Sequence, residues 1–181
     1  MDKVIFLDRD DTILIDSGYM YNPHDIYYCD SAIEGMKIFN SLGFQLIIVT
    51  NQSGVGRGYF TKKQYNKFNQ SMLDGLKKEG VIINDQFVCF HNPKDNCACR
   101  KPKIGLLNTY LNNNKFNKNK SYMIGDQISD MKFGNNLGIR TILINSMNNF
   151  SHDNQTDIII NYFAKDLLEA GKYIQREILE Y

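Results

Sequence analysis

Short runs of apolar residues alternate with longer stretches of mixed polarity along most of the chain. The apolar runs predict buried strands at residues 4–7, 46–49, 87–90, 122–124, 141–144 and 158–160. The stretches between them predict helices at residues 31–42, 61–79, 104–111, 129–136 and 164–179. Wholly apolar strands separated by helices are typical of a parallel sheet that is covered on both faces. The pattern therefore predicts an α/β fold with a doubly wound parallel sheet.

The helix predicted at residues 61–79 has the clearest boundaries. Thr61 is a favourable N-cap, and Gly80 follows the last helical residue. Apolar side chains recur on one face of this helix, at Tyr65, Phe68, Met72 and Leu76. We interpret that stripe as part of the core and not as a binding groove.

Length, charge and the lengths of the apolar runs indicate a single-domain protein that binds neither nucleic acid nor membranes. A length of 181 residues predicts a single domain over residues 1–181, and the net charge of +1 gives no reason to bind nucleic acid. The first apolar run has four residues, too few for a signal peptide, and no run is long enough to cross a membrane. We therefore expect a cytoplasmic protein that associates with neither nucleic acid nor membranes. Residues 112–120, rich in asparagine and lysine, predict a solvated loop.

Polar side chains gather where the predicted strands end. Asp8 and Asp10 follow the first strand, residues 50–53 follow the second, and Asp126 follows the fourth. Residues 89–101, at the end of the third strand, carry cysteines and a histidine and end with the cations Arg100 and Lys101. Because ligands bind beyond the carboxyl ends of strands in such sheets, we expect all four segments to share one site.

Each segment allows more than one interpretation by itself. Asp8 and Asp10 suit a divalent cation or a nucleophile with its acid–base partner, or they form a solvated acidic turn. Asp126, with Asp130 four residues later, suits a cation, or Asp126 caps the next helix. Thr50 and the glycine-rich residues after it suit an oxyanion, or they form a flexible loop.

The third segment contains metal-ligand spacing. Cys89 and His91 are followed by Cys97 and Cys99, and three thiolates with one imidazole satisfy tetrahedral Zn²⁺. No ligand position is left open, so we predict a structural zinc ion that staples the loop; reduced cysteines in a surface loop are the alternative. Cys29 is left over, and we expect a buried free thiol there.

The four segments together resemble the haloacid dehalogenase (HAD) superfamily of phosphoryl-transfer enzymes over residues 3–145. The matching motifs read FLDRDDT, IIVTNQSG, CRKP and MIGDQISD. The resemblance is greatest to the branch that acts on heptose bisphosphate and on histidinol phosphate. It implies a Rossmann-like HAD fold, a Mg²⁺-dependent phosphatase and a structural zinc ion beside the substrate. The short intervals between the motifs leave no room for a large cap, so we expect a capless enzyme.

The resemblance also implies a role for each motif residue. Asp8 is then the nucleophile that forms an aspartyl-phosphate, and Asp10 is the acid and base. Asp8, Asp126 and the backbone carbonyl of Asp10 hold Mg²⁺, while Thr50 and Lys101 stabilise the transferring phosphoryl group. The implied substrate contacts are Asp16, Ser17, Gly18, Tyr19, Thr50, Asn51, Gln52, Ser53, Arg100 and Lys101.

Two substrates fit this chemistry. The first is D-glycero-D-manno-heptose 1,7-bisphosphate, which loses its 7-phosphate while Arg100 and the loop with Arg57 meet the other phosphate. The alternative is histidinol phosphate, whose ammonium group needs a free carboxylate such as Asp11 or Asp16. We favour the phosphorylated sugar and expect a monomeric enzyme.

Three positions depart from the family motifs. Asp11 stands where the family has glycine, although aspartate tolerates a left-handed backbone better than most residues. Its added negative charge near the phosphate leaves a catalytically degenerate binding protein as a further alternative. Gln127 stands where lysine is usual, and Phe90 replaces a proline of the cysteine–histidine motif.

Overall fold

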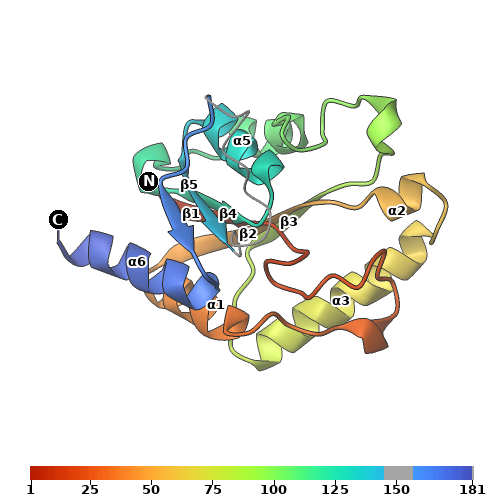
Figure 1. Ribbon diagram of the computed structural model, residues 1–181, viewed down its shortest axis with the longest axis horizontal. Helices are drawn as coiled ribbons and strands as arrows, with labels where there is room; N and C mark the ends of the chain where they lie inside the picture. The colour runs from red at the N-terminus through yellow and green to blue at the C-terminus, as the bar shows by residue number, and fades with distance from the viewer. Residues whose placement is uncertain (145–156, 181) are drawn as a thin grey trace.

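The computed structural model describes residues 1–144 and 157–180, which form a twisted parallel sheet between two layers of helices (Figure 1). The strands are β1 Lys3–Leu7, β2 Phe44–Asn51, β3 Asp85–Cys89, β4 Tyr122–Gly125, β5 Arg140–Ile144 and β6 Tyr162–Ala164. Their order in the sheet is β3-β2-β1-β4-β5-β6, and every neighbouring pair is parallel. The predicted doubly wound α/β fold is confirmed.

Helices cover both faces of this sheet. They are α1 Ala32–Ser41, α2 Ser53–Gly56, α3 Lys62–Lys78, α4 Asn108–Asn113, α5 Ile128–Leu137 and α6 Leu167–Leu179. Helices α1, α3 and α6 share one apolar core with alternate residues of the central strands, and α4 and α5 share a second core with the residues between them. None of the described helices is long and apolar enough to cross a bilayer.

Helix α3 has the boundaries that its sequence predicts. The Thr61 hydroxyl accepts a hydrogen bond from the Gln64 backbone N–H, and the Gln64 side chain accepts one from the Thr61 backbone N–H. Gly80 closes the helix with a positive φ of 83°. The stripe interpreted as core is wholly buried, at Tyr65, Phe68, Met72 and Leu76.

The strand predicted at residues 158–160 is wrong, because the last strand, β6, begins at Tyr162. Side chains hold the backbone of the predicted segment instead. The Asn135 amide exchanges two hydrogen bonds of 2.9 Å with the Ile159 backbone, and the Thr141 hydroxyl donates to the Ile159 carbonyl at 2.7 Å. Ile159 is 65% exposed, so the apolar run does not enter the core.

Two predicted helices and one loop also differ in extent. The last helix starts at Leu167, because the Asp166 carboxylate caps it by accepting from the Glu169 backbone N–H. The predicted helix at residues 104–111 is a 3₁₀ turn that leads into α4. Within the predicted solvated loop at residues 112–120, Phe116 is buried and packs edge-on against Phe6.

Candidate active site

The carboxyl ends of β1, β2 and β4 open into one cavity of about 340 Å³. The residues that line it are Asp8, Asp10, Asp11, Asp16, Thr50, Asn51, Arg100, Lys101, Asp126, Gln127, Ser129 and Asp130. The fold therefore brings residues from all four motif segments to a single place. No separate cap covers the cavity among the described residues, since the chain between β1 and α1 contains one short 3₁₀ turn, Pro23–Asp25.

A second cavity of about 320 Å³ adjoins the first. It is lined by Arg9, Asp10, Asp16, Gly18, Tyr19, Met20, Asn51, Gln52, Ser53 and Gly54. Asp10, Asp16 and Asn51 line both cavities, so the two form neighbouring compartments beside Asp10. Of the implied substrate contacts, Ser17 is exposed and lines neither compartment.

Lys101 lies at the centre of the first cavity. Its ammonium group donates to Asp8 Oδ1 and to the Val49 carbonyl, both at 2.7 Å, and it forms an ion pair with Asp130 Oδ1 at 2.7 Å. Burial raises the pKa of Asp8 to about 8 against the opposing effect of Lys101. Burial lowers the pKa of Lys101, but Asp130 and Asp8 outweigh it and hold that pKa above its ordinary value. The lysine is therefore charged at neutral pH and aimed at Asp8.

Three carboxylates around this lysine form a candidate cation site. Oxygen atoms of Asp8, Asp126 and Asp130 all lie within 4.8 Å of one another. Asp126 Oδ1 is buried and has no hydrogen-bond partner among the described residues, while Gln127 Nε2 donates to Asp126 Oδ2 at 2.5 Å. Burial raises the pKa of Asp126 to about 6. A site with more buried carboxylates than cations and one unpartnered oxygen fits Mg²⁺, which prefers oxygen ligands.

Arg9, which sequence reasoning missed, fixes the orientation of Asp10. Its guanidinium contacts Asp10 Oδ1 at 2.7 and 2.8 Å through two nitrogens, and the residue is only 1% exposed. The guanidinium carbon lies 5.7 Å from the ring centre of Tyr65 and 5.2 Å from that of Phe68, both on α3. The sequence did contain a signal for this role, since Arg9 is a charged residue between two aspartates at the end of a buried strand.

Gln52 lines the second cavity and also forms a hydrogen bond with Asp10. Its amide nitrogen donates to Asp10 Oδ2 at 2.7 Å and to Thr50 Oγ1 at 2.9 Å, and the residue is 5% exposed. Both oxygens of Asp10 are thus held, one by Arg9 and one by Gln52.

Asp11 occupies the position where the family has glycine, and its backbone is left-handed with a φ of 50°. The expectation that aspartate tolerates this turn is confirmed. Its carboxylate also accepts a hydrogen bond of 2.9 Å from the Asp16 backbone N–H, and Asp16 in turn accepts one of 2.8 Å from the Gly18 N–H. Asp11 therefore anchors the loop that carries Asp16, Gly18 and Tyr19 into the second cavity.

We expect Asp11→Gly to keep the turn but release this loop, because glycine adopts positive φ freely and offers no acceptor to the Asp16 N–H. Hydrogen exchange at the Asp16 amide should accelerate at least about threefold, which is the loss of roughly 0.7 kcal/mol of protection. Asp11→Asn retains the acceptor oxygen and should restore the slow exchange. Equal exchange rates in Asp11→Gly and the unmodified protein would contradict this anchoring role.

The cysteine–histidine cluster lies beside these cavities, at the end of β3. Ligand atoms of Cys89, His91, Cys97 and Cys99 lie within 4.8 Å of one another. The Sγ···Sγ and Sγ···Nδ1 separations run from 3.1 to 3.7 Å. Ligands at about 2.3 Å from a tetrahedral zinc ion would be about 3.8 Å apart, so the cluster is close to the required size. All cysteines are reduced, and Cys29 is a half-buried free thiol.

Backbone hydrogen bonds join the cluster loop to the loop after β2. The Gly56 N–H donates to the Phe90 carbonyl at 3.0 Å, and a Cβ on Gly56 would lie 2.5 Å from that carbonyl oxygen. The Lys101 N–H donates to Asn51 Oδ1 at 3.1 Å. Phe90 packs edge-on against Tyr65 at 4.9 Å, so the residue that replaces the usual proline is used in packing. The loop at residues 89–99 thus leads directly into the cavity through Arg100, whose Nη1 is buried without a partner among the described residues.

Comparison with known proteins yields relatives over most of the chain. A family model described as HAD-hydrolase-like matches residues 98–170. A probable D-glycero-D-manno-heptose-1,7-bisphosphate 7-phosphatase of Thermoplasma volcanium is 42% identical over 125 residues, which cover 69% of this chain and 86% of the relative. The D-glycero-beta-D-manno-heptose-1,7-bisphosphate 7-phosphatase of Pasteurella multocida is 32% identical and covers 97% of this chain and 98% of the relative.

Other matches mark the breadth of the family. The histidine biosynthesis bifunctional protein HisB of Blochmanniella floridana is 36% identical over 78% of this chain and 40% of its own length. The D,D-heptose 1,7-bisphosphate phosphatase of B. bronchiseptica, solved with magnesium and phosphate, has the same fold with a TM-score of 0.85 at 24% identity, over 97% of this chain and 99% of that chain. Identity above 30% over nearly the whole chain, on a fold with the motif residues gathered at one edge, settles the family. The chain belongs to the haloacid dehalogenase-like phosphatases.

Proposed function

We propose that the protein removes the 7-phosphate of D-glycero-D-manno-heptose 1,7-bisphosphate through an aspartyl-phosphate on Asp8. The observation that carries the chemistry is the buried Asp8 carboxylate beside the Lys101 ammonium at 2.7 Å, at the edge of the Asp126 and Asp130 cluster. The substrate is supported by the names of relatives that match at 32% and 42% identity.

In the first step, an oxygen of Asp8 attacks phosphorus, and the bond from phosphorus to the sugar oxygen breaks. Asp10 gives its proton to the departing oxygen, so the sugar leaves as an alcohol. In the second step, water attacks the phosphorus of the aspartyl-phosphate and Asp10 takes a proton from that water. The bond from phosphorus to the Asp8 oxygen breaks, which releases inorganic phosphate and regenerates the Asp8 carboxylate. Arg9 and Gln52 hold Asp10 in place for both proton transfers.

Charge at the transferring group is met by Lys101 and by the Thr50 hydroxyl, both of which line the first cavity. Mg²⁺ would be held by Asp8 and Asp126, with the backbone carbonyl of Asp10 and the buried Asp130 beside them. When bound, the cation supplies positive charge that allows a carboxylate to approach a phosphate dianion. The relative from B. bronchiseptica was solved with magnesium and phosphate, which supports this assignment.

The two cavities would bind different parts of the substrate. We place the reacting phosphate in the first and the sugar in the second, where Asp16, Gly18, Tyr19 and Asn51 would contact it. Arg100, with its unpartnered Nη1 at the edge of the first cavity, would bind the second phosphate as a planar fork. Ser53 and Gln52 line the second cavity as well. Ser17 would contact substrate only at the rim.

We assign a structural zinc ion to Cys89, His91, Cys97 and Cys99. All four side chains are needed as ligands, so none is left for a reacting molecule. The ion would close residues 89–99 and thereby position Arg100 and Lys101. The predictions of a single domain, a monomer and a cytoplasmic location are kept as expectations from the sequence.

Histidinol phosphate is the alternative substrate. The Asp11 and Asp16 carboxylates line the first cavity outside the cation cluster and offer an ammonium group a partner, and one relative is a histidine biosynthesis protein. A degenerate binding protein is disfavoured, since Asp11 preserves the turn that its motif requires.

Steady-state kinetics with Mg²⁺ should give the bisphosphate a kcat/KM at least about tenfold above that of histidinol phosphate, because Arg100 adds an ionic contact of about 1.4 kcal/mol or more. Arg100→Ala should remove most of this preference by raising KM for the bisphosphate. Arg176→Ala is the matched control, since Arg176 is exposed on α6 and lines neither cavity. Arg57, which the sequence suggested for the second phosphate, also lines neither cavity but donates to Ser53 beside the second one. Faster turnover of histidinol phosphate would refute the proposed substrate and leave the phosphatase chemistry intact.

A further inference from the structure

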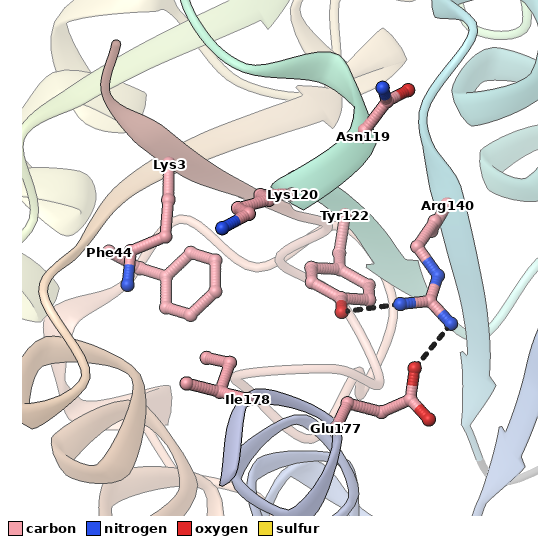
Figure 2. A pocket seen from close by; sticks show the side chains of 8 residues that line it. All are labelled: Lys3, Phe44, Asn119, Lys120, Tyr122, Arg140, Glu177 and Ile178. Atoms are coloured by element: carbon pink, nitrogen blue, oxygen red, sulfur yellow. Dashed lines mark hydrogen bonds and ion pairs between the residues drawn. The ribbon is translucent and has the colours of Figure 1, made fainter. Parts of the chain in front are cut away.

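Another cavity, of about 440 Å³, lies at the end of the sheet opposite the catalytic residues. It is lined by Lys3, Phe44, Asn119, Lys120, Tyr122, Arg140, Glu177 and Ile178 (Figure 2). Lys3, Phe44, Tyr122 and Arg140 begin β1, β2, β4 and β5, so the cavity lies at the amino ends of the strands. Residues from the end of α6 close the remaining side (Figure 2).

The floor of this cavity is aromatic. Phe44 and Tyr122 are only 5% and 3% exposed, and their ring centres lie 6.0 Å apart in an edge-to-face arrangement. Ile178, which is 39% exposed, faces the rings from α6 (Figure 2). The Lys3 ammonium lies over the Phe44 ring at 4.8 Å and the Arg140 guanidinium over the Tyr122 ring at 5.3 Å, so the apolar body of a ligand would contact the ring edges and Ile178.

The rim is cationic. Lys3 is fixed above the Phe44 ring at 4.8 Å, where its ammonium donates to the Leu42 carbonyl at 2.7 Å. Arg140 is held by the Tyr122 hydroxyl at 3.0 Å and by Glu177 at 2.6 Å. The Lys120 ammonium has no partner among the described residues.

Three cations and one carboxylate leave two positive charges over this aromatic floor. The Glu177 carboxylate neutralises Arg140, so the unbalanced charge resides on Lys3 and Lys120. Their ammonium groups have donors to spare, because Lys3 uses one on Leu42 and Lys120 uses none on another side chain. An anion with two negative charges and a flat body matches both features of the cavity.

We propose that this cavity is a second ligand site, which binds a small organic phosphate whose ring lies against Phe44, Tyr122 and Ile178 and whose phosphate lies between Lys3 and Lys120. We assign it no phosphoryl transfer, since Glu177, the one carboxylate among its described lining residues, is engaged with Arg140. It lies at the opposite edge of the sheet from Asp8, so it can be occupied together with the catalytic cavity.

The test uses phenylphosphonate, a ring with a dianionic head that a phosphatase cannot hydrolyse at its carbon–phosphorus bond. Titration of the isotope-labelled protein should give saturable shifts of the backbone amides at the starts of β1, β4 and β5. Lys120→Gln should weaken binding about fivefold, the effect of one lost charge pair near the surface. Lys118→Gln is the matched control, because Lys118 lies in the same 3₁₀ turn and does not line the cavity.

Three further measurements separate this site from the catalytic one. Inorganic phosphate should bind here more weakly than phenylphosphonate, because it lacks the ring. Ile178→Glu, a change at a half-exposed position, should weaken binding by placing a like charge at the mouth. Asp8→Asn should leave the shifts at this edge unchanged. Shifts confined to residues near Asp8, absence of saturation, or equal weakening by Lys118→Gln and Lys120→Gln would overturn the proposal.

Discussion

Replacement of Asp8 with asparagine is expected to lower kcat by at least about a thousandfold, which corresponds to about 4 kcal/mol in the activation barrier. The amide has nearly the shape of the carboxylate and can still accept the 2.7 Å hydrogen bond from Lys101. The neutral amide is, however, a poor nucleophile toward phosphorus. The aspartyl-phosphate that water normally hydrolyses is therefore not formed. Single-turnover measurement with Mg²⁺ and the preferred phosphate ester gives the loss directly.

The same substitution should leave the fold intact. Lys101 keeps its contacts with Asp130 and the Val49 carbonyl, so no buried charge loses all its partners. Burial raises the pKa of Asp8 to about 8, which means that the folded protein disfavours the ionised carboxylate. The melting temperature of Asp8→Asn, without added magnesium, should therefore equal or exceed that of the unmodified protein.

Asp25→Asn is the matched control, because Asp25 is an aspartate in the short 3₁₀ turn before α1 and lines neither catalytic cavity. It should retain full activity. An Asp8→Asn enzyme that keeps more than a few per cent of the turnover would contradict covalent catalysis by Asp8. A strongly lowered melting temperature would instead show that Asp8 contributes mainly to stability.

Local signals explain why most of the fold could be predicted. The central strands are apolar on both faces and α3 has a capping box, so these elements are set by neighbouring residues alone. The apolar run at residues 158–160 has the same local appearance but forms no strand, and Ile159 is exposed. Its backbone is bound by Asn135 and Thr141, which are distant in the sequence, so no pattern in the run itself could exclude pairing with the sheet.

The candidate site shows the same division. The gathering of Asp8, Thr50, Lys101 and Asp126 could be predicted because each follows a strand of one parallel sheet. The engagement of Asp10 by Arg9 and Gln52 could not, because it depends on side-chain rotamers that residue type does not fix. Gln52 was predicted to contact substrate, and the structure adds a positioning role through two hydrogen bonds.

The cavity at the opposite edge had no sequence signal at all. Its residues begin separate strands and belong to no motif, and only the register of β1, β4 and β5 brings Lys3, Tyr122 and Arg140 together. Lys3 is a single lysine before the apolar residues of a central strand, which by itself indicates no ligand site. The charge and the aromatic floor become visible as one feature only in three dimensions.

Cys97→Ser is expected to lower bound zinc from about one equivalent per chain to less than about a tenth, since serine is a poor ligand and the remaining three groups leave the tetrahedral set incomplete. Most of the loop at residues 89–99 is exposed, so it has little apolar packing to keep it closed without the metal. Its opening would disturb Arg100 and Lys101, because they follow the loop directly and the Lys101 backbone is held only by two hydrogen bonds with the Asn51 side chain among those described. We therefore also expect a higher KM for the phosphate ester and a lower melting temperature.

The chain supplies its own control for this experiment in Cys29, a free thiol outside the cluster. Cys29→Ser should keep its zinc, its KM and its activity. Elemental analysis of protein purified under reducing conditions without added metal gives the zinc stoichiometry. Thiol titration before and after chelation should reveal three newly reactive cysteines, because removal of the metal releases Cys89, Cys97 and Cys99 together. Less than about a tenth of an equivalent of zinc in the unmodified protein, or equal zinc loss in Cys29→Ser and Cys97→Ser, would show that the cluster is not the metal site.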